Sequence, residues 1–143
     1  MYKLFIRKNI SSENFLKEIL GKYHINYDIF YNEYGKPYIK NNPIYFNISN
    51  CDDYTVIAIC DKEIGVDIEK ITIKQKVIDK VCNEKEKKLI KNDKDFTKLW
   101  VKKEAYVKCI GMGLSYGLKN VDTTKIRFKL KKYKDYYIGI YIK

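Results

Sequence analysis

The sequence predicts an α+β fold in which two similar α/β halves, about residues 1–62 and 63–143, form a single domain as a pseudo-dimer. The first observation behind this prediction is that 143 residues with 45% hydrophobic side chains can enclose a core of their own. The second is the order of the expected elements, which is strand, helix, strands and then strand, helices, strands.

The first half combines one expected helix with four expected strands. Ser11 or Ser12 can cap the helix, and apolar residues recur at helical spacing from Phe15 until the helix ends near Gly21. Alternating or continuous apolar patterns predict strands at 2–6, 27–31, 44–48 and 54–60. Residues 56–59 are apolar on both faces, which predicts a central position for the last of these strands.

The second half begins with an expected strand at 64–68 and continues with expected helices at 76–90 and about 95–110. The apolar residues of the second helix fall largely on one face, and Gly111 and Gly113 are expected to end it. Two alternating segments follow at 126–130 and 136–142. The polar stretch between them, at 131–135, predicts the turn of a hairpin.

The formal net charge of +11 is concentrated in the second half of the chain. Residues 1–64 contain eight basic and eight acidic side chains, whereas residues 65–143 contain twenty-one basic and ten acidic ones. Such a surface attracts an acidic protein, a polyphosphate ligand or nucleic acid. A lysine-rich composition spread over solvated faces is an equally good explanation.

Composition argues against several kinds of protein. No run of eighteen apolar residues predicts a transmembrane helix, and the short, charged N-terminus does not resemble a signal peptide. The four cysteines form no CxxC pair and the chain has a single histidine, so a zinc site is not expected. Reduced thiols in a cytoplasmic protein are the simplest interpretation.

Two acidic residues stand out in the expected strand at 64–68 and its extension. Because they are two positions apart, Asp67 and Glu69 point to the same face, and Gly65 is expected to leave that face open. Two carboxylates on one face are costly unless a cation neutralises them. Taken alone, the pattern favours a half-buried edge strand with two solvated acids.

The expected helix at 95–110 carries Glu104 and Lys108, four residues apart on one face. Alone, they form an ordinary stabilising surface pair, although Trp100, one turn earlier, indicates a packed helix edge. If this helix packs on the strand at 64–68, three carboxylates and one ammonium converge. Hard oxygen ligands beside a cation are what Mg²⁺ and a phosphate-rich substrate require.

In combination, these segments resemble the signature of the 4′-phosphopantetheinyl transferase superfamily. The match joins Gly65-Val66-Asp67-Ile68-Glu69 to Trp100-x-x-Lys103-Glu104-Ala105-x-x-Lys108 and to the following Gly111-Met112-Gly113-Leu114. Upstream, Glu33-Tyr34-Gly35-Lys36-Pro37-Tyr38 and Phe46-Asn47-Ile48-Ser49 resemble motifs of the surfactin-synthetase-activating (Sfp-type) branch. The four motifs occur in the family's order over about residues 27–118.

The resemblance implies the 4′-phosphopantetheinyl transferase fold and a holo-acyl-carrier-protein synthase type of enzyme. Such an enzyme transfers the phosphopantetheine arm of coenzyme A to a serine of an apo carrier protein and releases 3′,5′-ADP. By similarity, Asp67, Glu69 and Glu104 would hold Mg²⁺, with Mn²⁺ as an alternative. Glu104 would also help to deprotonate the serine, and Lys108 would stabilise the departing phosphate.

Further contacts follow from the same resemblance. Lys36 and Ser49 would contact the nucleotide of coenzyme A and its phosphates. An acid in the helix between the two acidic motifs would position the carrier serine. Glu86 is the first choice for that acid, and Glu84 competes with it.

The chain departs from the family pattern in two places. Asn50 stands where the family usually has a histidine that contacts a phosphate, and an asparagine donates a hydrogen bond without a full charge. The N-terminal half is also short. Arg7 and Lys8 are therefore the candidates for holding the 3′-phosphate of coenzyme A.

The leading hypothesis is a monomeric, cytoplasmic transferase whose basic second half docks an acidic acyl, peptidyl or polyketide carrier protein. The alternative is a coenzyme A- or nucleotide-binding module without catalysis, which Asn50 and the short N-terminal half motivate. A nucleic-acid-binding domain ranks lowest. The charge and the fourteen tyrosines come without a helix-turn-helix, ribonucleoprotein or zinc-finger pattern.

Overall fold

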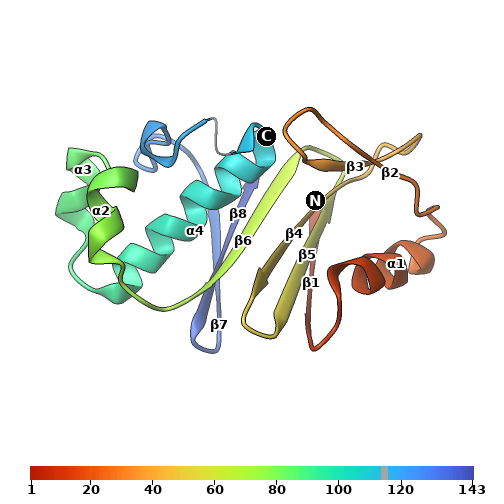
Figure 1. Cartoon of the computed structure of the whole chain (residues 1–143), viewed down its shortest axis with the longest axis horizontal. Helices are drawn as coiled ribbons and strands as arrows, with labels where there is room; N and C mark the ends of the chain where they lie inside the picture. The colour runs from red at the N-terminus through yellow and green to blue at the C-terminus, as the bar shows by residue number, and fades with distance from the viewer. Residues whose placement is uncertain (114–115) are drawn as a thin grey trace.

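The computed structural model describes residues 1–113 and 116–143. Leu114, the last residue of the family motif that follows Lys108, lies outside the described residues. Figure 1 shows two groups of elements, one around α1 (Ser12–Lys22) and the other around α4 (Asp93–Ile110). The two groups meet along β4 (Tyr45–Cys51) and β6 (Ile64–Lys70).

In the N-terminal group, α1 covers a three-stranded antiparallel sheet in the order β1-β5-β4. The outer strand β1 (Tyr2–Lys8) and β4 pair with opposite edges of β5 (Tyr54–Cys60), which is buried along its length and central, as predicted. Ser11 caps α1 by accepting a hydrogen bond from the backbone N–H of Asn14. The apolar core between helix and sheet consists of Phe15, Leu16, Ile19, Leu20, Ile39, Phe46, Ile57 and Ile59.

The C-terminal group also places one helix on a three-stranded antiparallel sheet. Its order is β6-β8-β7, with β8 (Tyr136–Ile142) in the centre and β7 (Lys129–Tyr133) as the outer strand. Helix α4 packs across β6 and β8 (Figure 1). The mixed α+β class is therefore the one that the sequence predicts, whereas the pseudo-dimer relation of the halves stays a prediction.

Two glycines allow α4 to lie close to its sheet. A Cβ added at Gly65 would stand 1.8 Å from the carbonyl oxygen of Ala105, and one added at Gly139 would stand 2.4 Å from that of Val101. The expectation that Gly65 leaves an open face is therefore wrong, because the backbone of α4 fills the space beside it.

Strands β4 and β6 are joined by side chains of β4. Asn47 Oδ1 accepts a hydrogen bond from the N–H of Val66 at 2.9 Å, and Ser49 Oγ accepts one from the N–H of Ile68 at 3.1 Å. On the sheet faces opposite to the helices, the two groups share an apolar core that contains Tyr54, Val56, Ala58, Cys60, Ile64, Val66, Ile68, Tyr136, Ile138 and Ile140. The position of β6 beside β4 is thus fixed by both polar and apolar contacts.

Three elements differ from the predicted ones. The helix expected at 76–90 consists of two short helices, α2 (Gln75–Val81) and α3 (Glu84–Leu89). The break arises because Asn83 forms a capping box with Glu86 and begins a new helix there. The final hairpin turn is shorter than expected, since β7 extends to Tyr133. The short strand β3 (Pro37–Ile39) was not expected and pairs with β2 (Ile29–Tyr31).

The 3₁₀ turn η2 (Leu118–Asn120) lies between α4 and the final hairpin. Among the described residues, no helix combines the length and the apolar character needed to cross a membrane.

Candidate functional site

Asp67 lies in the middle of β6 and is only 4% exposed. Its Oδ1 accepts hydrogen bonds from Lys108 Nζ at 2.9 Å and from Ser49 Oγ at 3.1 Å. Lys108, on α4, also donates to the carbonyl oxygen of Val66 at 3.2 Å. The second oxygen, Oδ2, is buried without a hydrogen-bond partner in the part of the chain that the structure describes. A buried carboxylate oxygen without a hydrogen-bond partner lowers the stability of the fold, and it leaves a position open for a ligand.

Glu69 and Glu104 belong to the same electrostatic group as Asp67, and we call these three residues with Lys108 the acidic site. Burial and then the charge of Asp67 raise the pKa of Glu104 to about 7. The same two causes, in the same order, raise the pKa of Glu69. Burial also raises the pKa of Asp67, although the charge of Lys108 opposes it. Asp67 and Lys108 are in direct contact, and Glu69 and Glu104 lie near enough to Asp67 for its charge to raise their pKa values.

The acidic site offers oxygen ligands of the kind that Mg²⁺ and Mn²⁺ prefer. Among residues 1–113 and 116–143, however, no group of three or more His, Cys, Asp or Glu side chains is placed so that it could hold a metal ion. Asp67 is instead shared by Lys108 and Ser49. The unpartnered Oδ2 and the mutual repulsion of three carboxylates fit a divalent cation, provided that the side chains of Glu69 and Glu104 turn towards it.

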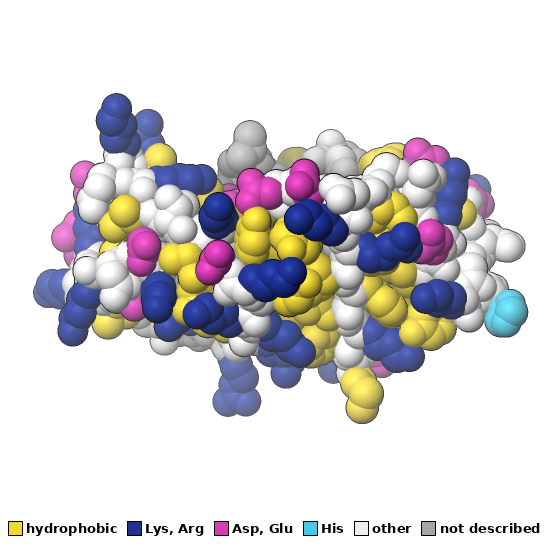
Figure 2. Space-filling view, turned by 90° about the horizontal axis from the view of Figure 1, so that it is seen from below, with side chains coloured by type: hydrophobic (Ala, Val, Ile, Leu, Met, Phe, Trp, Pro, Cys, Tyr) yellow, Lys and Arg dark blue, Asp and Glu magenta, His cyan; other side chains and the backbone are white. Residues whose placement is uncertain are grey.

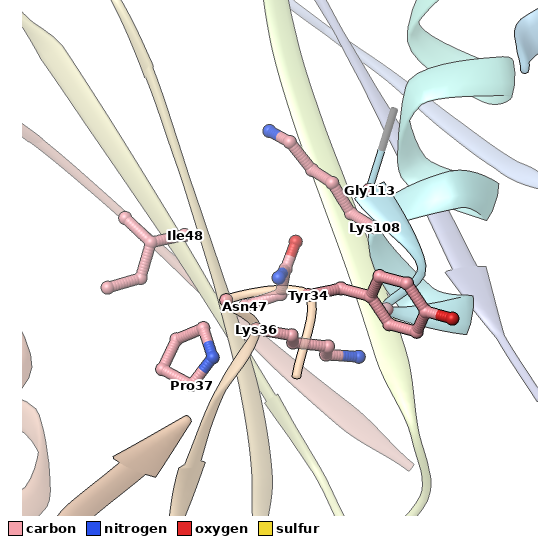
Figure 3. Close-up of a pocket in the computed structure, with 9 residues that line it drawn as sticks. Tyr34, Lys36, Pro37, Asn47, Ile48, Lys108 and Gly113 are labelled. Carbon is pink, nitrogen blue, oxygen red and sulfur yellow. The ribbon is translucent and has the colours of Figure 1, made fainter. Parts of the chain in front are cut away.

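A pocket of about 190 Å³ opens beside Lys108. Its lining comes from the β2–β3 connection, from β4 and from the end of α4: Tyr34, Gly35, Lys36, Pro37, Asn47, Ile48, Lys108, Gly111 and Gly113. Figure 3 shows that the side chains of Lys36 and Lys108 run in different directions, so that their amino groups lie far apart. Pockets that enclose a whole drug-sized ligand measure about 300–1,000 Å³, so this one suits a part of a larger molecule.

Lys36, predicted to contact the nucleotide, is buried and fully hydrogen-bonded. Its Nζ donates to Glu63 Oε2 at 2.8 Å, to the carbonyl oxygen of Cys109 at 2.8 Å and to that of Ile64 at 3.3 Å. An ammonium has three protons, and all three are used here. Lys36 therefore ties the β2–β3 connection to the start of β6 and the end of α4, and would contact a phosphate only by giving up one of these bonds.

Ser49 and Asn50 are neighbours in β4 but lie in different surroundings. The hydroxyl of Ser49 donates to Asp67 and accepts from a backbone N–H of β6, so Ser49 orients the acidic site. Asn50 Nδ2 donates to Ser12 Oγ at 3.1 Å, and its Oδ1 accepts from Thr55 Oγ1 at 2.7 Å. The structure thus joins Ser49 to the acidic site and places Asn50 at the start of α1.

Arg7 and Lys8, predicted to hold the 3′-phosphate, lie in β1, which β5 separates from β4. Arg7 forms an ion pair with Glu18 of α1, and its guanidinium lies 5.6 Å from the ring centroid of Phe15. Lys8 Nζ lies 5.5 Å from the ring centroid of Tyr54. Within the described residues, no hydrogen bond or ion pair joins either side chain to the acidic site.

Glu86, the first choice for positioning a carrier serine, has no exposed surface. It forms an ion pair with the equally buried Lys103 at 2.7 Å and accepts hydrogen bonds from Thr123. Lys103 also donates to the carbonyl oxygens of Leu118 and Val121. The pair therefore anchors the segment that follows α4, and Glu86 has no access to a serine of another protein. Residue 84, the competing choice, is exposed.

Lys74, the residue before α2, was missed from the sequence. Its Nζ lies 5.0 Å from the ring centroid of Trp100. Its charge lowers the pKa of all three carboxyl groups of the acidic site. In the sequence it is one lysine among many, and only the packing beside Trp100 distinguishes it.

The segment that contains β6 and α4 matches the model of a known protein family. The chain belongs to the 4′-phosphopantetheinyl transferase superfamily, whose family model matches residues 63–140, more than half of the chain. Its relatives are of the Sfp type. The chain is 34% identical over 113 residues to the 4′-phosphopantetheinyl transferase gsp of Aneurinibacillus migulanus, covering 71% of this chain and 47% of the relative.

Two other relatives extend the comparison. The chain is 37% identical over 94 residues to the 4′-phosphopantetheinyl transferase Sfp of Bacillus subtilis (strain 168), covering 60% of this chain and 42% of that protein. It is 29% identical over 110 residues to the L-aminoadipate-semialdehyde dehydrogenase-phosphopantetheinyl transferase of Xenopus laevis, covering 62% and 36%. The chain spans less than half of the length of these three relatives.

Proposed function

We propose that this protein transfers the 4′-phosphopantetheine group of coenzyme A to a serine of an apo carrier protein, with Mg²⁺ or Mn²⁺ bound at the acidic site. The observation that carries the proposal is the meeting of Asp67, Glu69, Glu104 and Lys108 where α4 crosses β6. Membership of the superfamily and the printed names of the relatives support it. The same residues would also be the functional core of a single domain with halves 1–62 and 63–143.

In the proposed reaction, the serine oxygen attacks the phosphorus that carries the pantetheine arm. A new oxygen–phosphorus bond forms, the bond to the other phosphate breaks, and 3′,5′-ADP leaves. Glu104 takes the serine proton, directly or through water. Lys108 places a positive charge beside the departing phosphate. A divalent cation held by Asp67, Glu69 and Glu104 would neutralise charge on the pyrophosphate.

The proposed protein partner is an acidic carrier protein. We propose that it is the substrate of this enzyme, which acts as a monomer in the cytoplasm. Figure 2 shows one face of the molecule, on which Lys and Arg side chains surround a group of hydrophobic ones. The excess of basic residues in 65–143 gives long-range attraction to an acidic helix, and the apolar group gives it a surface to pack on. Fatty-acid, polyketide and nonribosomal-peptide carriers all meet this description.

The test is a transfer assay across apo carrier proteins of these three classes. The protein is incubated with coenzyme A, MgCl₂ and each carrier, and the carrier is weighed by mass spectrometry. We expect a gain of one phosphopantetheine on at least one carrier and its loss in Asp67→Ala, which should keep the circular dichroism spectrum of the parent. Glu18→Ala, which removes an exposed acid of α1, is the matched control and should retain transfer. Full transfer by Asp67→Ala would refute the assignment of the acidic site.

A second candidate is a coenzyme A- or nucleotide-binding module without catalysis. A departure from the family pattern motivates it: Asn50, which carries no full charge, stands where the family usually has a histidine. Calorimetric titration with coenzyme A separates the two candidates. Saturable binding without transfer to any carrier would favour the module over the enzyme.

A further inference from the structure

The loop that leads from β6 to α2 is fastened to α4. The N–H of Thr72 donates to Thr97 Oγ1 at 3.0 Å, and this hydroxyl donates to the carbonyl oxygen of Thr72 at 2.8 Å. Thr97 is buried whereas Thr72 is exposed, so both bonds are partly shielded from water. The reciprocal pair holds the end of the loop, and with it Lys74, beside the middle of α4.

Lys74 lies against the one tryptophan of the chain. Its Nζ is 5.0 Å from the ring centroid of Trp100, within the range of a cation–π interaction. Lys74, Trp100 and Glu69 line the same small hollow. The ammonium is therefore held on the Glu69 side of the acidic site by an aromatic face.

Lys108, the lysine of the acidic site, binds a carboxylate directly. Lys108 donates to Asp67 Oδ1 from α4, whereas Asp67 Oδ2 stays buried and unpartnered. Three carboxylates thus share two lysines that come from separate elements. The charge of Lys74 acts on all three, because it lowers the pKa of Asp67, of Glu69 and of Glu104.

We propose that Lys74 is a built-in counter-ion of the acidic site, which competes with a divalent cation and thereby sets the affinity of the site for metal. This inference rests on the metal site of the proposed function. A fixed positive charge beside the carboxylates stabilises them when the metal is absent and repels an incoming cation. The folded protein is then less destabilised by its three buried or half-buried acids when no metal is bound. The affinity of the site for a divalent cation is lower as a consequence.

The test uses the full chain and MgCl₂ as the probe. Because Trp100 contacts Lys74 and is the single tryptophan, its fluorescence reports on the site, and calorimetry gives an independent dissociation constant. Measurements are made at pH 8, above the pKa of about 7 of Glu104, so that Glu104 is mostly ionised. We expect Lys74→Gln to bind Mg²⁺ about three to ten times more tightly than the parent, since the repulsion is lost.

Two variants serve as controls. Lys76→Gln removes the same charge two residues further on, at a position that is exposed like Lys74 but outside the hollow that Lys74 lines with Glu69 and Trp100, and should change the dissociation constant by less than about twofold. Lys74→Arg keeps the charge and the cation–π contact, and should bind Mg²⁺ as the parent does. Circular dichroism shows whether each variant is folded, and Lys74→Arg keeps the test valid if Lys74→Gln is not.

The outcomes separate this inference from the proposed function. Equal or weaker Mg²⁺ binding by Lys74→Gln than by Lys76→Gln would overturn the counter-ion role while leaving the metal site in place. A changed affinity in Lys74→Arg would also overturn it, because charge would then not be the cause. If the parent shows no saturable Mg²⁺ binding that Asp67→Asn removes, both the inference and the proposed metal site fail.

Discussion

The two groups of elements place a helix on a three-stranded sheet in different ways. Helix α1 meets β4 and β5 through aliphatic and aromatic side chains, and its charged residues lie at the rim. Helix α4 meets β6 and β8 with its backbone close to Gly65 and Gly139, and it also carries the half-buried Glu104 and the buried Lys103, which pairs with Glu86 of α3. The three carboxyl groups with raised pKa values all lie in β6 or α4.

The difference shows how one architectural plan serves two purposes. Apolar packing in the N-terminal group tolerates repacking as long as volume is kept. Close backbone contact and paired charges in the C-terminal group fix atoms to within a narrow range, which a site for metal and phosphate requires. Substitutions that are matched between the two groups should therefore have unequal effects.

The largest effect is expected for a methyl group added between α4 and β6. Gly65→Ala would place its Cβ 1.8 Å from the oxygen of Ala105 and 2.5 Å from the nitrogen of Cys109, and backbone atoms cannot give way as a side chain would. We expect a loss of at least about 3 kcal/mol in the free energy of unfolding, measured by urea denaturation. In Gly21→Ala, in α1, nothing lies within 4 Å of the new methyl, and a gain of about 0.5–1 kcal/mol is expected. Equal stabilities of the two variants would contradict the comparison.

The second-largest difference is expected between two ion pairs, one buried in the C-terminal group and one exposed in the N-terminal group. Glu86→Ala leaves Lys103 buried without its carboxylate and is expected to lower the free energy of unfolding by about 3–5 kcal/mol. Glu18→Ala removes an ion pair whose side chains are both 49% exposed, and should lower it by about 1 kcal/mol or less. Thermal unfolding of both variants under identical conditions provides the measurement. A Glu86→Ala protein as stable as Glu18→Ala would show that the buried pair is not required.

A smaller, pH-dependent effect is expected at Glu104. Its pKa is about 7 in the folded protein, against 4.5 for an ordinary glutamate, so the folded state binds an extra proton between these values. The stability of the metal-free parent should therefore fall as the pH rises from about 4.5 to 7, and Glu104→Gln should remove this loss. We expect the variant to be more stable than the parent by on the order of 1–2 kcal/mol at pH 8 and by little at pH 4.5.

The control for this prediction is the same comparison in the presence of MgCl₂. A bound divalent cation would stabilise the ionised parent more than the Gln variant and reduce or reverse the difference at pH 8. Unfolding curves of parent and variant that differ equally at every pH would show that Glu104 is not the titrating group.

The smallest effect is expected in the N-terminal group. Asn50→His introduces the histidine that the family usually has at this position. Asn50 is hydrogen-bonded to Ser12 and Thr55. A histidine can carry a charge near neutral pH, so we expect the KM for coenzyme A in the transfer assay to fall by about twofold to fivefold, with kcat nearly unchanged. An unchanged KM would show that residue 50 does not contribute to coenzyme A binding.

Periodicity predicts most of this fold because strands and helices longer than about five residues repeat their apolar positions. β3 was missed because it has three residues and begins with Pro37, a residue typical of turns. The break between α2 and α3 was readable in the sequence, since Asn83 and Glu86 have the spacing of a capping box. The lysine-rich pattern of 76–90 concealed that signal.

The acidic site could be predicted because two short-range spacings determine it. Asp67 and Glu69 share a strand face, and Glu104 and Lys108 share a helix face, so packing of the two elements suffices. Hydrogen bonds between the N-terminal and C-terminal groups of elements cannot be deduced in this way. The internal hydrogen bonds of Lys36 and Ser49 were therefore not foreseen. Arg7 and Lys8 were chosen for their charge and their position before the helix at Ser12, without a motif, and the structure gives them partners elsewhere.

The outer strands β1 and β7 have a consequence for the behaviour of the protein at high concentration. Each ends its sheet with a row of backbone groups that a strand of another molecule could join. Both carry exposed basic side chains: Lys3, Arg7 and Lys8 on β1, and Lys129, Lys131 and Lys132 on β7. Two copies that tried to extend a sheet across these borders would bring like charges together, so the surplus of lysine also protects the chain against fibre-like self-association.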